Sequence, residues 1–240
     1  MDKSIVIIPT YNEADNIALM LASLMHLWES LSVLVVDDAS PDGTADIVMD
    51  LIKEYPDRIF LENRKEKTGL GPAYVHGFRW VLARDYDYIF EMDADFSHNP
   101  KDLKSLYTIL HKDQSDVVVG SRYVKGIQVI NWPLGRILLS YFASLYVRLV
   151  TSLPVKDTTA GFVGYKSQVL RSIDLDQIRF SGYAFQIEMK FKAWRKGFRL
   201  TEIPIVFTDR IRGVSKMNRS IISEAIFGII LMKIKSWYAK

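Results

Sequence analysis

Residues 88–97 of this 240-residue chain read YIFEMDADFS, an apolar run that ends in two acids separated by one residue. Aromatic and branched residues dominate Tyr88–Met92, which predicts a buried strand. Side chains two apart in an extended segment point the same way, so we expect Asp93 and Asp95 to project together from the strand end. Carboxylates are ligands that Mg²⁺ and Mn²⁺ prefer, and phosphate oxygens and water would complete the octahedron.

Similar short runs recur on both sides of this segment, and helical patterns separate them. We predict strands at Ser4–Ile8, Ser32–Asp37, Arg58–Leu61 and Asp116–Val119, and helices at Ala14–Leu27, Thr44–Glu54, Pro72–Ala83 and Lys101–Leu110. Strands that alternate with crossover helices predict an α/β fold with a mostly parallel sheet flanked by helices. Ligands of such sheets bind at the carboxyl ends of the strands, so the residues directly after each strand are the functional candidates.

The composition excludes several classes of site. The chain has no cysteine, which removes disulfides, thiolate metal sites and cysteine nucleophiles, and indicates a reducing compartment. Its four histidines include no pair three to five residues apart, so we expect no histidine-based zinc site. The glycines Gly69 and Gly71 lack the third glycine of a dinucleotide-binding loop, and neither a P-loop nor a nucleophile elbow is present.

Charge divides the chain at Arg210. Residues 1–209 carry 24 basic and 27 acidic side chains, whereas residues 210–240 carry seven basic and one acidic. We therefore expect one catalytic domain over 1–209 and a basic C-terminal extension over 210–240. No charge-free apolar run reaches the roughly 20 residues of a bilayer span, since the two longest candidates are Ile137–Val147 and Ala225–Met232.

Both of these runs are nevertheless more apolar than typical surface helices. Lys233, Lys235, Lys240 and two aromatic residues border the second run, as in helices that lie in a membrane interface. We expect an amphipathic helix there that holds the chain on the cytoplasmic face of a membrane. The alternative is that both runs bury their apolar faces on the domain itself or on a partner.

A second acidic strand end lies at Asp37-Asp38. The following segment Pro41–Thr44, PDGT, is explained by turn formation and by capping of the next helix. Turn formation does not explain the two adjacent acids, because a buried carboxylate needs a ligand, a cation or an arginine.

Basic residues form a third group of candidates. Arg122 follows the strand that ends at Val119, Arg136 begins an apolar stretch, and Arg210 and Lys216 precede the C-terminal run. One guanidinium group can donate to two phosphate oxygens at once, and lysine adds a compact positive charge. Solvated surface charge would explain most lysines of the chain, but it explains Arg136 poorly.

Together, these segments resemble the family 2 glycosyltransferases with the GT-A fold, and within them the dolichol-phosphate mannosyltransferases. The similar segments span nearly the whole chain: 9–13 (PTYNE), 37–44 (DDASPDGT), 69–74 (GLGPAY), 92–95 (MDAD), 121–123 (SRY), 157–162 (DTTAGF) and 209–216 (DRIRGVSK). The first and fourth segments occur in many sugar transferases. PDGT and the R-x-x-G-x-S-K ending are closer to the mannosyl-phosphate branch.

The resemblance implies a Rossmann-like GT-A domain that transfers mannose, with inversion, from GDP-mannose to a polyprenyl (dolichyl) phosphate. For donor binding it implies Pro9, Tyr11, Glu13, Val36 and Asp38 at the nucleoside, and Asp93, Ala94, Asp95, Arg210 and Lys216 at the diphosphate. Asp93, Asp95 and Ser97 would hold Mg²⁺ or Mn²⁺. Arg122 and Arg136 would bind the acceptor phosphate, and these two arginines and Asp95 are the expected catalytic residues.

Two local departures accompany the resemblance. Ser97 stands where some relatives carry a glutamine metal ligand, and Lys156 precedes Asp157 where a small residue is expected. Many relatives also have a C-terminal membrane domain. Here we expect membrane attachment through interfacial helices or through a small membrane-anchoring subunit.

The lack of a strongly placed histidine agrees with a lipid phosphate as the acceptor, because such a phosphate is already anionic and needs no general base.

Two other functions are weighed against this one. The first alternative is a polyprenyl-phosphate glucosyl- or hexosyltransferase, or a hydroxyl-directed family 2 transferase. The second is a receiver-like module built on Asp37-Asp38, against which the acids at Asp93 and Asp95 argue. The uneven charge does not indicate nucleic-acid binding.

Overall fold

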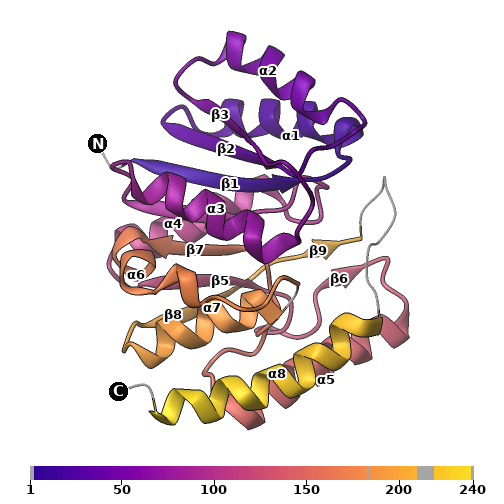
Figure 1. Cartoon of the computed structure of the whole chain (residues 1–240), viewed down its shortest axis with the longest axis vertical. Coiled ribbons are helices and arrows are strands. Elements are labelled where there is room, and N and C mark those ends of the chain that lie inside the picture. The colour runs from indigo at the N-terminus through magenta and orange to yellow at the C-terminus, as the bar shows by residue number, and fades with distance from the viewer. Residues whose placement is uncertain (1–2, 183, 210–218, 239–240) are drawn as a thin grey trace.

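A seven-stranded sheet between two layers of helices forms the body of the protein (Figure 1). The computed structural model describes residues 3–182, 184–209 and 219–238. The sheet contains β1 (Ser4–Thr10), β2 (Leu31–Asp37), β3 (Ile59–Asn63), β4 (Tyr88–Glu91), β5 (Val117–Ser121), β7 (Val163–Lys166) and β8 (Leu200–Pro204). Their order is β3-β2-β1-β4-β7-β5-β8.

The helices of the body are α1 (Ala14–Leu27), α2 (Thr44–Glu54), α3 (Leu70–Leu82), α4 (Leu103–His111), α6 (Ser167–Ser172) and α7 (Ala184–Arg195), with short 3₁₀ turns at Pro100–Asp102 and Leu175–Gln177. The predictions for Ala14–Leu27 and Thr44–Glu54 are confirmed to the residue. The five predicted strands and the other two helices are confirmed with ends shifted by at most two residues.

One strand departs from the parallel arrangement. β7 lies between β4 and β5 and runs antiparallel to both, whereas the other pairs in the sheet are parallel. Gly164 in β7 permits this insertion, because a Cβ atom there would come within 2.9 Å of the Phe90 ring. Four residues that include a glycine and a lysine show no strand periodicity, so the sequence did not predict β7.

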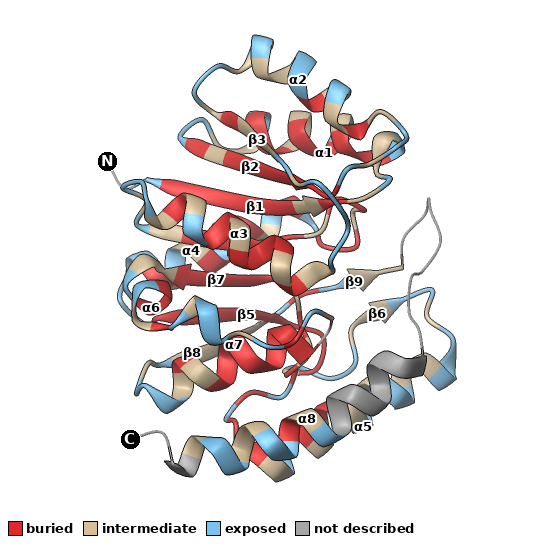
Figure 2. Cartoon of the chain, viewed as in Figure 1, coloured by how far each residue is buried: buried red, intermediate tan, exposed pale blue. Residues whose placement is uncertain are grey.

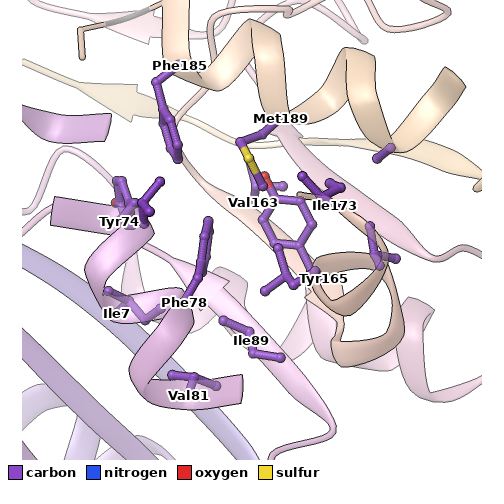
Figure 3. Packing of buried hydrophobic residues seen from close by; sticks show 14 of the residues in the cluster. Ile7, Tyr74, Phe78, Val81, Ile89, Val163, Tyr165, Ile173, Phe185 and Met189 are labelled. Atoms are coloured by element: carbon purple, nitrogen blue, oxygen red, sulfur yellow. The ribbon is translucent and has the colours of Figure 1, made fainter. Parts of the chain in front are cut away.

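Alternate residues of the strands pack into two separate cores. Figure 2 shows that the central strands of the sheet are mostly buried. Ile5 and Ile7 of β1 face α3, α6 and α7, and Val6 and Ile8 face α1, α2 and α4. The first core is rich in aromatic rings, of which Figure 3 shows Tyr74, Phe78 and Phe185. The Tyr74 and Phe185 rings lie parallel with centroids 5.7 Å apart. This stacking fixes the start of α7, which borders the functional site.

Two long helices form a separate layer below the sheet (Figure 1). α5 (Leu134–Thr151) and α8 (Arg219–Tyr238) pack side by side, and Val147, Ile187 and Ile229 form a small core between them and α7. Much of the remaining surface of α5 and α8 is apolar and exposed: Leu134, Leu138, Leu139, Tyr141, Phe142, Leu145, Leu149, Phe227, Ile230, Leu231 and Ile234. We call this set the α5/α8 surface. It agrees with the expectation that both apolar runs are more apolar than ordinary surface helices.

By length and composition, α5 is the one helix among the described residues that could cross a membrane. Only three of its residues, Ser144, Val147 and Thr151, are buried. The sequence predicted no span here, because Arg136 and Arg148 bound the charge-free run Ile137–Val147. Length and composition alone do not separate a span from a helix that lies on a surface.

Lys233 has a different environment from the predicted one. Its ammonium group donates to the carbonyl oxygen of Thr151 at 3.2 Å and lies 6.0 Å from the centre of the Phe191 ring. A cation at the carboxyl end of a helix is favoured by the helix dipole. Lys233 therefore ties α8 to the end of α5, and of the three lysines assigned to a membrane surface, only Lys235 is described as exposed.

Candidate active site

The acidic segment after β4 forms a turn. β4 ends at Glu91, and Phe96 adopts a left-handed conformation with a φ of 58°. Asp95 Oδ1 accepts hydrogen bonds from the backbone N–H of Ser97 at 3.0 Å and from Ser97 Oγ at 2.6 Å. The prediction that the chain stays extended through Asp95 is wrong, because it bends at residues 94–97. Asp93, Asp95 and Ser97 nevertheless line one cavity, as the prediction requires.

Asp93 and Asp95 fit a divalent cation that keeps part of its coordination for other ligands. Asp95 is buried, whereas the side chain of Asp93 is 40% exposed. Within 3–182, 184–209 and 219–238, no three histidine, aspartate or glutamate side chains gather as a ready cation site. An ion that takes two carboxylates and completes its shell with water and phosphate oxygens suits this donor set. Ser97 Oγ already donates a hydrogen bond to Asp95, so direct ligation of the metal by Ser97 stays a prediction.

His98 forms the wall of the cavity next to these acids. Its ring is 3% exposed, stacks on Phe162 with centroids 5.0 Å apart, and meets the edge of Phe207. Burial lowers the pKa of His98 to about 4, so the ring is neutral at pH 7. Its Nδ1 atom lies 4.0 Å from Asp93 Oδ2. Sequence reasoning missed His98 because a lone histidine carries no spacing signal.

The cavity has a volume of about 410 Å³ and two kinds of wall. Charged and polar side chains line one part: Asp93, Asp95, His98, Arg122, Arg136, Thr159, Gln186 and Asp209. Apolar side chains of α5, α7 and α8 line another: Leu139, Ala143, Tyr146, Val147, Ile187 and Ile229. Such a cavity suits a ligand that has an anionic group and an apolar body.

Arg122 is held by a buried carboxylate. Its Nε donates to Asp157 Oδ2 at 2.7 Å and its Nη2 to Asp157 Oδ1 at 2.6 Å, and Nη2 also reaches Thr159 Oγ1 at 2.8 Å. Burial alone would raise the pKa of Asp157, but the Arg122 guanidinium holds it below its usual value. The sequence predicted the arginine but not this partner. A role for Arg122 in binding phosphate stays a prediction.

Arg136 lies in the first turn of α5, beside the ring of Trp132. Its Nη1 donates to Asp209 Oδ1 at 2.9 Å, and its guanidinium carbon lies 4.1 Å from the centre of the Trp132 ring. The guanidinium carbon of Arg122 lies 5.4 Å from Trp132 and 5.6 Å from Phe207. The fold therefore brings the two predicted arginines together around residues that the sequence analysis did not select.

A buried polar network supports the floor of the cavity. Gln186 Nε2 donates to Glu91 Oε2 at 2.6 Å, and Lys190 Nζ donates to the carbonyl oxygens of Ala160 at 2.6 Å and Gln186 at 3.0 Å. Burial raises the pKa of Glu91 to about 8 and lowers that of Lys190 to about 8, and each charge opposes the shift of the other. Lys190 thus joins the segment 158–161 to α7.

The acids at the end of β2 have separate tasks. Asp37 accepts hydrogen bonds from Thr10 Oγ1 at 2.7 Å and from Ser40 Oγ at 2.6 Å, so it stabilises the loops after β1 and β2. Asp38 pairs with Arg64 at 2.8 Å, and burial raises its pKa despite this cation. The expectation that these acids face a ligand, a cation or an arginine is confirmed for Asp38. For Asp37 it is wrong, because hydroxyl and backbone donors of the two loops satisfy that carboxylate.

The residues predicted to hold the nucleoside lie at the ends of β1 and β2, and none of them lines the cavity described above. Lys67 lies 4.0 Å from the centre of the Tyr11 ring, and Glu13 Oε2 accepts a hydrogen bond from Asn16. Pro9 is partly exposed.

For two of the predicted donor residues, only a role through backbone atoms stays a prediction. The side chains of Val36 and Ala94 are buried in the two hydrophobic cores, with exposed fractions of 0% and 3%. They cannot contact a donor with those side chains, which leaves only their backbone atoms. The assignments of Arg210 and Lys216 lie outside the described residues.

Comparison with known proteins agrees with this geometry. Residues 5–174 match the family described as glycosyl transferase family 2. A polyprenol monophosphomannose synthase from Mycolicibacterium smegmatis is 44% identical over 95% of this chain and 85% of its own length. An undecaprenyl-phosphate mannosyltransferase from Micrococcus luteus is 44% identical over 94% of this chain and 91% of its own length.

Solved structures share the architecture. Glucosyl-3-phosphoglycerate synthase from Mycobacterium tuberculosis, in complex with Mn²⁺, UDP and phosphoglyceric acid, superposes with a TM-score of 0.70 at 16% identity, over 98% of this chain and 78% of that one. The same enzyme in complex with Mg²⁺ and UDP also gives 0.70, at 15% identity over 98% and 79%. The fold is therefore that of the GT-A glycosyltransferases, and the chain is a glycosyltransferase that belongs to family 2.

Proposed function

We propose that this chain transfers mannose from GDP-mannose to a polyprenyl phosphate, with inversion at the sugar carbon, to give a polyprenyl β-mannosyl phosphate. The cavity carries this proposal, because in it Arg122 and Arg136 adjoin an apolar wall contributed by α5, α7 and α8. An anionic headgroup can meet the arginines while a prenyl chain lies along the apolar wall. The names of the two relatives with 44% identity support the same acceptor and sugar.

For the donor, Asp93 and Asp95 would hold Mg²⁺ or Mn²⁺, which would neutralise the charge that develops on the departing GDP. Ser97 orients Asp95 through two hydrogen bonds. Pro9, Tyr11, Glu13 and Asp38 would hold the nucleoside at the ends of β1 and β2. Arg210 and Lys216 would bind donor phosphates from the segment after β9 (Phe207–Thr208).

On the acceptor side, Arg122 and Arg136 would align the lipid phosphate for in-line attack on the sugar carbon. Asp157 fixes the position of Arg122, and Asp209 pairs with Arg136 at the more open side of the cavity. A phosphate monoester is anionic at neutral pH, so no residue has to remove a proton from the attacking oxygen.

The α5/α8 surface gives the proposed site access to lipid. A phosphate acceptor with a long prenyl chain has to be taken from a bilayer, and exposed apolar helices can enter the interface of that bilayer. We propose that the chain binds peripherally to the cytoplasmic face of a membrane through this surface. A small membrane-anchoring subunit that binds the same surface is the alternative route.

A matrix of donors and acceptors tests the proposed function. Purified protein is incubated with GDP-mannose, GDP-glucose or UDP-glucose and with undecaprenyl or dolichyl phosphate, in Mg²⁺, in Mn²⁺ or in EDTA. We expect transfer of mannose to either lipid phosphate, and its loss in EDTA. Transfer from a glucose donor alone would replace this proposal with a polyprenyl-phosphate glucosyltransferase.

A further inference from the structure

Lys190 is a lysine of α7 with no exposed surface. Its ammonium group donates to the carbonyl oxygens of Ala160 at 2.6 Å, Gln186 at 3.0 Å and Thr158 at 3.3 Å. Burial of a charge is costly even among polar partners, and apolar side chains of similar volume often stabilise a fold equally well. Packing alone therefore does not explain why a lysine stands here.

Two of these carbonyl groups flank Thr159, which lines the cavity. Lys190 binds the residue before Thr159 and the residue after it. Between these two bonds, Thr159 Oγ1 accepts a hydrogen bond from Arg122 Nη2 at 2.8 Å. One buried ammonium group thus fixes the backbone on both sides of a side chain that contacts Arg122.

A carboxylate holds the start of the same segment. Glu202 of β8 accepts hydrogen bonds from the backbone N–H groups of Lys156 at 2.7 Å and Asp157 at 2.8 Å. Asp157 in turn binds the Arg122 guanidinium through both of its carboxylate oxygens. Residues 156–160, which we call the floor segment, are therefore tied at two places, and each tie positions an oxygen atom that orients Arg122.

Arg136 is held by other elements. Its partner Asp209 follows β9, and β9 pairs with β6 (Val129–Ile130). A change in the floor segment should therefore displace Arg122 and leave Arg136 in place.

We propose that Lys190 is a positioning residue for the acceptor: by holding the floor segment on both sides of Thr159, it keeps the Arg122 guanidinium where it binds the phosphate of the prenyl phosphate. Glu202 has the same task beside Asp157. This inference rests on the proposed function, because it assumes that Arg122 binds the lipid phosphate. Gln186 is bonded to Glu91 through its own amide, so the turn that carries Asp93 and Asp95 should keep its position without the lysine.

Ligand binding tests the proposal without turnover. Lys190→Met keeps an unbranched apolar stem and removes the ammonium group. Calorimetric titration, at a temperature where the variant is fully folded, should show farnesyl phosphate binding weakened by about tenfold, because a displaced guanidinium loses a hydrogen bond to a charged group. Binding of GDP with Mn²⁺ should be unchanged. Unchanged binding of farnesyl phosphate, or equal weakening of both ligands, would overturn the proposal.

Lys192→Met is the matched control on the same helix. Lys192 donates to the carbonyl oxygen of Gln177 and pairs with Glu188, and it is not among the described residues that line the cavity. This variant should bind farnesyl phosphate like the wild-type protein, and weakening equal to that of Lys190→Met would overturn the proposal.

Glu202→Gln keeps the test decisive if Lys190→Met does not fold. Glu202 is only partly buried, and an amide in its place can accept from one backbone N–H but not from both. We expect the same selective loss of farnesyl phosphate binding, with GDP binding retained. Loss of both ligands, or of neither, would contradict the positioning role.

A double-mutant cycle tests the route through Thr159. Thr159→Val removes the hydroxyl group that accepts from Arg122, so Lys190→Met should add little to the loss of farnesyl phosphate binding in that background. Losses that multiply would show that Lys190 acts elsewhere and would overturn the proposal. If the wild-type protein binds no farnesyl phosphate, the proposed acceptor itself is wrong, whereas binding by the wild-type protein and equally by the variants refutes the positioning role alone.

Discussion

At the ends of β1 and β2, buried acids are satisfied by nearby residues of the same half of the sheet. Asp37 accepts hydrogen bonds from Thr10 and Ser40, and Asp38 accepts one from Arg64. These partners lie 27, 3 and 26 residues away in the sequence. We call this region the donor side.

The cavity beyond β4 and β5, which we call the acceptor side, is assembled differently. Arg122 donates to Asp157, Arg136 donates to Asp209, and Glu91 accepts a hydrogen bond from Gln186. The partners lie 35, 73 and 95 residues apart in the sequence. The donor side is thus built from motifs and local turns, whereas the acceptor side exists only once the whole sheet and α5 are in place. Variants should affect catalysis and stability differently on the two sides.

Asp95→Ala should give the largest effect. Loss of the buried carboxylate that is proposed to hold the metal should reduce turnover by about 10³-fold, with little change in the binding of lipid phosphate. Initial rates at saturating GDP-mannose measure this effect. Asp50→Ala is the control, because Asp50 is 77% exposed on α2, where it forms an ion pair with the exposed Lys53. Full activity of Asp95→Ala would contradict the proposal that Asp95 holds the metal.

Asp157→Asn should be the most destabilising of the charge-neutralising changes on the acceptor side. It leaves the buried Arg122 guanidinium without its counter-charge, so the free energy of unfolding should fall by about 3–5 kcal/mol. Asp209→Asn is the matched change in a pair whose side chains are 26% and 27% exposed, and it should cost about 1 kcal/mol or less. Urea unfolding of both variants tests this contrast, and equal losses would contradict it.

The α5/α8 surface should respond to single polar substitutions. Phe142→Ser and Leu149→Ser each remove an exposed apolar side chain, and each should weaken binding to anionic vesicles by roughly tenfold. Leu19→Ser is the control, since Leu19 is 58% exposed on α1 and outside the surface. Vesicle sedimentation measures the effect. If all three variants bind like the wild-type protein, the surface does not contact lipid.

The smallest effect concerns acid stability. Because Arg122 holds the pKa of Asp157 below its ordinary value of about 3.9, the pair contributes stability above that pH and loses it as the pH falls through the lower, folded-state pKa. Asp157→Asn should therefore lose less stability than the wild-type protein between about pH 4 and 2. Urea unfolding at several pH values measures this, and parallel slopes would contradict it.

Much of the fold and part of the site could be predicted from sequence. Asp93 and Asp95 follow an apolar run, and Arg136 adjoins a charge-free one, so pattern alone selected them. Asp157 begins one of the similar segments, but its pairing with Arg122 could not be predicted, and neither could that of Gln186 with Glu91. β7 enters the sheet antiparallel, and only the finished fold brings these residues together. Trp132 stands four residues before Arg136, but a single aromatic residue has no period to reveal its place in the cavity.

Val36 and Ala94 were named only through the resemblance. Their side chains are buried in the two cores, so any contact with a donor would come from their backbone atoms.

The central claim is that the acceptor side takes a lipid phosphate. The most direct test compares undecaprenyl phosphate with undecaprenol, which has the same chain and a hydroxyl group, as acceptors for radiolabelled GDP-mannose. We predict label in the lipid phase only with the phosphate, in a product whose sugar linkage is β. Transfer to undecaprenol, or an α-linked product, would contradict this account.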